Sequence, residues 1–381
     1  MSHAPRQRVV PRRAFFKTAA AGGVLGSLAG RSWGAAPGEP AGPSDSERSI
    51  TALYRSLTPE QRTAVCFDWD FRVDIKYGRK PLWRPDPQGI LLRTHVANAW
   101  RITPQLIGSN FFTDEQRELI LDVLRATIAH DWIDKLKQQA RDDSGVAWGG
   151  DQALAIFGVP GAGPCQCVIT GFHLTIRATT ERSSQAAFGG PISHGHQPSG
   201  FYEKVEHPGN FFWKQSLLAN EVYRMFDAGQ QQQALVKENL PYYQRLNEID
   251  RSVILPDTPW DAPRREQDIR FRRVGDPALG LPVARFGRDQ RSALEAVLAG
   301  LLEPYRSDYQ NQVFDCLKQQ GGLQACSLAF YQERDLGNDG IWDNWRLEGP
   351  ALTWFFRGSP HVHIWIHVAR EPSAPITSYF G

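Results

Sequence analysis

The clearest helical pattern in the chain follows Thr113. Five apolar side chains there recur at three- and four-residue spacing: Leu119, Ile120, Val123, Leu124 and Ile128. This spacing predicts a helix with one face packed on a core. Thr113 stands three residues before Gln116, the separation at which a hydroxyl and an amide cap a helix start reciprocally. The same device at Thr58 and Gln61, with a proline at the first helical position, predicts another helix start.

Strand-like patterns dominate two other parts of the chain. From Ala153 the chain reads as strands broken by glycine and proline, with 158–164 as a hairpin loop. The last third predicts strands over 323–331, 345–348, 351–356 and 361–368. Helices are expected between these parts, over about 210–228, in a glutamine-rich piece that follows, and over 289–320.

Consecutive strands with helices segregated before and between them favour an α+β fold, with a largely antiparallel sheet flanked by helices. We expect one large domain over residues 50–381. The sequence shows no internal repeat.

The amino-terminal segment indicates export. Residues 11–17, Pro-Arg-Arg-Ala-Phe-Phe-Lys, resemble the twin-arginine signal, in which two arginines precede an apolar pair and a lysine. A weakly apolar stretch over 18–30 is too short to span a bilayer, and Gly34-Ala35-Ala36 offers small residues for cleavage. We therefore predict a signal peptide over 1–36, a linker over 37–49, passage through the twin-arginine machinery, and a periplasmic or secreted mature protein without a stable membrane anchor.

The charge of the mature chain excludes some partners. The formal net charge is +2, but six basic residues and no acidic ones lie in the first 36, which leaves −4 for the remainder. A slightly acidic protein has no general attraction to nucleic acid or to anionic lipid. The five cysteines are too few and too scattered for a disulfide scaffold.

Candidate chemistry is concentrated in the last predicted strand. Residues 361–368 alternate, so the valines and isoleucines share one face while His361, His363 and His367 share the other with Trp365. His361 and His363 are about 6.6 Å apart along the strand, a separation that two converging imidazoles can close onto one ion. His367 lies about 13 Å from His363, too far to share that ion. Hydrogen bonding on a polar sheet face is the alternative interpretation.

A pair of ligands is half a site, and two other places could supply the rest. One is His173, on a strand after the glycine loop. The other is the segment 193–207, where glycine and proline hold polar side chains in a loop. Its candidate residues are His194, His196, Glu203, Glu206 and His207. Hydrogen bonds that order this loop are the alternative to metal binding or catalysis.

With these motifs, the chain resembles a secreted bacterial family of unknown function. Members of that family have a Leu-x-x-x-Gln-Arg helix start, a Gly-His-His-Leu strand, and an Arg-x-x-Gly-Pro strand followed by His-x-His. Residues 57–62, 171–174, 346–350 and 361–363 match these motifs, with Phe172 in place of one histidine. The resemblance brings no activity, but it implies that His173, His361 and His363 belong to one site.

Our leading hypothesis is an exported metal-dependent enzyme with His173, His361 and His363 as ligands, and with the loop from His194 to His207 as one wall. Neutral imidazoles suit Zn²⁺ or Cu²⁺, whereas Fe²⁺ prefers a carboxylate in the set. With zinc, Glu203 or Glu206 could act as general base, and His207 is a further catalytic candidate.

Hydrolysis is favoured because exported bacterial enzymes are often hydrolases. A copper or iron oxidoreductase is the alternative reaction class. A non-catalytic metal- or sugar-binding protein and a metal-free carboxylate glycosidase also remain open. Twelve tryptophans suit stacking on a saccharide, so we expect a saccharide or another small molecule as substrate.

Overall fold

The structure is a computed structural model. It describes residues 44–73, 76–77, 80–81, 90–97, 99–180, 185–197, 211–236, 271–272, 278–332, 335, 340–358 and 361–376. The residues that carry the predicted export signal lie outside these ranges, and the export signal stays a prediction. No helix in the described part of the chain is both long and apolar enough to cross a bilayer.

Two helices begin at the caps that the sequence predicts. Thr58 and Thr113 each form the predicted capping box, with Gln61 and Gln116 respectively. The first helix starts at Asp45, inside the segment expected to be a linker. The helices are α1 Asp45–Ser56, α2 Pro59–Val65, α3 Asp114–Arg125, α4 His130–Ser144, α5 Trp213–Arg224, α6 Ala228–Ala234, α8 Arg288–Leu302 and α9 Ser307–Gln319.

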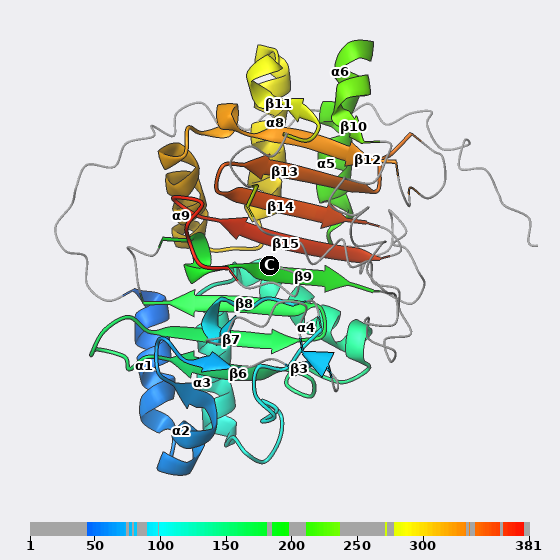
Figure 1. Cartoon of the computed structure of the whole chain (residues 1–381). Coiled ribbons are helices and arrows are strands. Elements are labelled where there is room, and N and C mark those ends of the chain that lie inside the picture. Colours follow the sequence, from blue (N-terminus) through cyan, green and yellow to red (C-terminus); the bar gives the residue numbers. More distant parts are fainter. Residues whose placement is uncertain are drawn as a thin grey trace, which may run out of the picture.

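An 11-stranded sheet forms the centre of the molecule (Figure 1). Its order is β1-β6-β7-β8-β9-β15-β14-β13-β12-β10, with β11 also beside β12. All neighbours are antiparallel except β1 with β6 and β10 with β12, which confirms the predicted α+β class. The strands are β1 Cys66–Phe67, β6 Ala153–Phe157, β7 Gln166–Gly171, β8 Leu174–Thr179, β9 Ile192–His196, β10 Leu235–Val236, β11 Leu281–Pro282, β12 Ser327–Tyr331, β13 Asn344–Gly349, β14 Leu352–Arg357 and β15 Val362–Val368. Two small sheets pair β2 Arg72–Val73 with β5 Ile90–Leu91, and β3 Lys76–Tyr77 with β4 Lys80–Pro81.

The two faces of the sheet differ in chemistry although both are buried. Ile364, Trp354 and Leu347 lie on one face and pack with apolar helix residues in the main core. Helices α5 and α8 lie behind this half of the sheet in Figure 1. The opposite face carries polar side chains, including His363 and, directly across from it on β14, Arg357. The predicted alternation along β15 thus separates an apolar face, which packs on the core, from a face that carries the histidines and other polar side chains.

The described topology contains an internal structural repeat, although the sequence shows no repeat. Apart from the short strands β2–β5 and β11, the described part of each half has two helices, a short edge strand, two more helices and a four-stranded antiparallel meander. The first meander is β6–β9 and the second is β12–β15. They meet where β9 pairs antiparallel with β15, with Ile192 opposite Ile366. The arrangement corresponds to a pseudo-twofold axis through this pair.

Matching hydrogen bonds in the two halves support the repeat. Gln61 and Gln116 donate to each other's side-chain oxygens over 2.8 Å in both directions. In the second half, Gln290 and Gln230 do the same over 2.8 and 3.4 Å. All four are the third residue of a helix whose start they cap. The two halves therefore share the same hydrogen-bond roles at these glutamines.

Candidate metal centre

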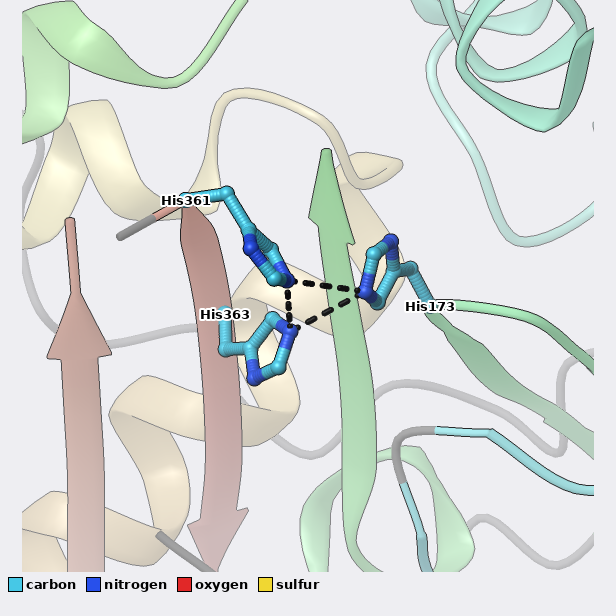
Figure 2. A group of neighbouring side chains, drawn as sticks. All are labelled: His173, His361 and His363. Atoms are coloured by element: carbon cyan, nitrogen blue, oxygen red, sulfur yellow. Dashed lines mark hydrogen bonds between the residues drawn. The ribbon is translucent and has the colours of Figure 1, made fainter. Parts of the chain in front are cut away.

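Three histidine side chains converge on the polar face of the sheet (Figure 2). The Nε2 atoms of His361 and His363 lie 2.6 Å apart, and those atoms lie 3.2 and 3.0 Å from Nε2 of His173. All three residues are buried, His361 being the most exposed at 7%. Among the described residues, these three form the only group with metal-ligand spacing. The grouping that the family resemblance implied is therefore present.

The ligand on the first half of the chain is placed by a tight turn. His173 is the second residue of the two-residue connection between β7 and β8, and its φ of 56° lies in the left-handed region. A non-glycine residue in this region costs about 1–3 kcal/mol and persists where the surroundings fix it. Asp151 contributes to that constraint by accepting a 2.7 Å hydrogen bond from the main chain of Phe172. Strain of this kind is common at functional sites.

A glycine on the intervening strand makes room for the imidazoles. Figure 2 shows β9 passing between His173 and the other two histidines, of which His363 lies on β15 and His361 directly precedes it. Gly195 of β9 lies opposite His363, and a side chain there would overlap the Val362 carbonyl and come within 3.3 Å of the His363 ring. Gly195 therefore allows the three rings to meet above the strand that separates them.

Asp143 holds the ring of His173 in place. Its buried carboxylate accepts a 3.0 Å hydrogen bond from Nδ1 of His173 and a 2.5 Å bond from the main chain of Gln197. With the proton assigned to Nδ1, the Nε2 of His173 presents a lone pair to the other two rings. A carboxylate behind a ligating imidazole is the usual outer support of a metal site.

Arg357 approaches the centre from the next strand. Its Nη2 lies 3.4 Å from Nε2 of His361 and can donate to it, which leaves that nitrogen unprotonated. Burial, with a smaller contribution from Arg357, lowers the pKa of His361 to about 2. The same two causes lower the pKa of His363 well below its ordinary value. These two imidazoles are therefore neutral at physiological pH, the form that binds metal.

The dimensions suit a transition-metal ion. With bonds of about 2.05 Å, two imidazole nitrogens in a tetrahedral site lie about 3.3 Å apart. The separations from His173 already approach this value. Only His361 and His363 would need to move apart, by about 0.7 Å, to bind one zinc ion.

The other predicted histidines do not join this group. His194 and His196 lie on the helix-covered face of β9, because His194 pairs with Ile364 and His196 with Val362. Nδ1 of His194 is 3.0 Å from the Tyr305 hydroxyl, and burial lowers the pKa of His194 to about 3.

The remaining candidates are also accounted for. Nε2 of His196 donates to Asp142 over 3.1 Å. His367 stacks on Phe271 with ring centroids 4.3 Å apart, away from the three ligands as expected. The predicted catalytic residues Glu203, Glu206 and His207 lie outside the described residues.

Sequence reasoning missed Asp143, Arg357 and Gly195. One signal was available for Asp143: two adjacent aspartates occupy the last turn of α4, where the helix dipole favours cations. The role of Gly195 depends on its register with His363, and the role of Arg357 depends on the pairing of β14 with β15. Neither register is visible in the sequence.

Comparison with known proteins identifies a family but no activity. No curated protein and no solved structure matches the chain. A family model described as "Protein of unknown function (DUF3500)" matches residues 44–372, a range that includes all three histidines and nearly all of the described fold. The expected membership of a family of unknown function is thereby confirmed: the chain belongs to the DUF3500 family.

Proposed function

We propose that this protein is an exported metal-dependent enzyme whose ion is held by His173, His361 and His363. The observation that carries the proposal is the convergence of three buried Nε2 atoms within 3.2 Å of one another. Without an ion, the Nε2 lone pairs of His173 and His361 face each other over 3.2 Å, because Asp143 accepts from Nδ1 of His173 and Arg357 can donate to Nε2 of His361. A bound cation satisfies all three.

Zinc and copper fit the donor set best. Both ions accept neutral imidazole ligands, whereas non-haem Fe²⁺ sites commonly include a carboxylate, and none of the described carboxylates belongs to the group. Zn²⁺ held by three imidazoles with an open fourth position acidifies coordinated water toward neutral pH. This supports hydrolysis as the reaction. If copper is the resident ion, an oxidoreductase becomes the better assignment.

A catalytic role is favoured over simple metal storage by the number of ligands. Structural zinc sites usually have four protein ligands, and the described residues supply three. The protein's own groups have distinct tasks in this proposal. Asp143 orients His173, Gly195 leaves space for the rings, and Glu203 or Glu206 is the general base with His207 as a further candidate.

Export is the second part of the proposal, and it rests on the residues around Arg12 and Arg13. A periplasmic or secreted location would give the enzyme access to small extracellular substrates such as saccharides. Replacing both arginines by lysine should retain the precursor inside the cell, as measured by fractionation of cells that express the full chain. Export of the double-lysine variant at the rate of the parent chain would contradict this route.

The metal site is tested by elemental analysis of the full chain purified after expression in a host with twin-arginine export. We expect about one equivalent of zinc or copper per chain, and loss of it in the His361→Ala, His363→Ala double variant. His367→Ala is the matched control, because this histidine lies on the same strand and face but outside the group. Absence of metal from the parent chain, or equal loss in the control, would refute the proposal. The metal found then decides between hydrolytic and redox assays.

A further inference from the structure

We infer that Gln139 is a positioning residue of the metal centre, which fixes the main chain of His173 so that the imidazole meets the other two histidines. This inference rests on the proposed function, because it names a further residue of the same site. Gln139 lies on α4 and is buried, and its Nε2 donates to the main-chain carbonyl of His173 over 3.2 Å. It would act on the ion only through His173.

The first argument is that the carbonyl of His173 has another partner. The main-chain N–H of Gly195 donates to the same oxygen over 3.1 Å. The bond from Gln139 is therefore not needed to satisfy a buried acceptor. What this bond adds is a link between the β7–β8 turn and a helix, whereas the bond from Gly195 links that turn to the neighbouring strand β9.

The second argument is the spacing of the two α4 residues that contact His173. Gln139 and Asp143 are four residues apart, so they lie one turn apart on the same face of the helix. Gln139 holds the main chain of His173, and Asp143 accepts a hydrogen bond from Nδ1 of its ring. One helix thus fixes both ends of the ligand. A histidine held only at its ring could still shift with its main chain, which would change the direction of Nε2.

The third argument is the conformation of the turn. The φ of His173 is 56°, a value that residues other than glycine rarely adopt. Relaxation to a negative φ would redirect the Cα–Cβ bond and carry the imidazole away from its partners. Asp151 accepts a hydrogen bond from the main chain before this residue, at Phe172, and Gln139 donates to the carbonyl after it. The two bonds together resist rotation on either side of His173.

Helix α4 is anchored well enough to serve as the support. Three of its apolar residues are buried in the main core: Trp132, Ile133 and Leu136. Its last turn is also linked to the end of β9, because Asp142 accepts a 3.1 Å hydrogen bond from His196. The helix therefore contacts both the turn that carries His173 and the strand that passes beneath the imidazoles.

The test compares Gln139→Leu with Gln215→Leu in the full chain loaded with Co²⁺. Gln215 is the matched control, because it is also buried and donates to a main-chain carbonyl, that of Gly300 over 3.4 Å. That bond joins α5 to α8 and does not involve the histidine group. Leucine removes the donor at either position and suits a helix.

Two properties are measured, the affinity for Co²⁺ by competition with a chelator and the visible spectrum, which reports coordination. Gln139→Leu should weaken Co²⁺ binding about 10-fold and change the spectrum of the bound ion, because His173 is no longer held in place. Gln215→Leu should change neither property. A structural role alone would lower the free energy of unfolding in both variants without this difference in the bound ion.

A second variant keeps the inference falsifiable if Gln139→Leu does not fold. Gln139→Met retains an unbranched side chain without a donor, and it should weaken Co²⁺ binding by the same factor. Parent-like affinity and spectrum in the Gln139 variants, or the same weakening in Gln215→Leu, would overturn the inference while leaving the metal site intact. Failure of the parent chain to bind Co²⁺ would overturn the proposed function itself, and this inference with it.

Discussion

Asp143 offers the sharpest test of how the centre is supported. Its carboxylate accepts a hydrogen bond from Nδ1 of His173, and its side chain is fully buried. Removing such an outer partner commonly weakens metal binding 10- to 100-fold, about 1.4–2.7 kcal/mol. Asn retains one acceptor and the shape, so we expect about a 10-fold loss for Asp143→Asn. Asp143→Ala removes the acceptor altogether, and we expect about a 100-fold loss.

The neighbouring residue provides the matched control. Asp142 also accepts a hydrogen bond from a histidine, 3.1 Å from His196, but that ring lies on the opposite face of the sheet. Metal affinity is measured by competition with a chromophoric chelator, and circular dichroism confirms folding. Asp142→Asn should leave metal affinity within about twofold of the parent value. Equal losses in the two asparagine variants, or an unchanged affinity in Asp143→Ala, would refute the assigned support.

Three other predictions concern stability. Gly195→Ala should destabilise the protein by about 2 kcal/mol and abolish metal binding, since its methyl group would meet the main chain opposite and crowd the His363 ring. The metal-free protein should lose stability as pH falls below about 6.5, because the unfolded chain then protonates His361 and His363 while the folded chain does not. Each histidine should lower the free energy of unfolding by up to about 2 kcal/mol at about pH 5, as measured by urea unfolding. Gln116→Ala should lower the free energy of unfolding by about 3 kcal/mol and Gln290→Ala by about 1 kcal/mol, because the first glutamine is buried and the second is partly exposed. Equal losses of stability in thermal unfolding of the two variants would contradict this reasoning.

The sequence predicted local features better than pairings. Capping residues such as Thr113, and the alternation through His363, depend on neighbours a few positions away, so they could be interpreted without coordinates. Sheet order depends on contacts between distant segments. The meeting of β9 with β15, which places Gly195 under the imidazoles, could not be predicted for that reason. The histidines of β9 illustrate the same limit, because the pattern showed that they cluster but not which face they occupy.

The pseudo-twofold arrangement has a consequence for how the ion and the fold depend on each other. Counted from the Ile192–Ile366 pair, the positions equivalent to His361 and His363 are Ala187 and Gly189, and the turn position equivalent to His173 is Ala351. The site related to the histidine group by the pseudo-twofold axis therefore has no imidazole at any of these three positions. Of the three converging histidines, one comes from the first half of the chain and two come from the second.

An ion bound by these histidines would link the two halves of the chain where β9 pairs with β15. A ligand present at about 1,000 times its dissociation constant stabilises the state that binds it by about 4 kcal/mol. Neither half contains the whole ligand set, so this stabilisation is available only when both halves are folded and joined. Metal loading would therefore stabilise both halves together against unfolding.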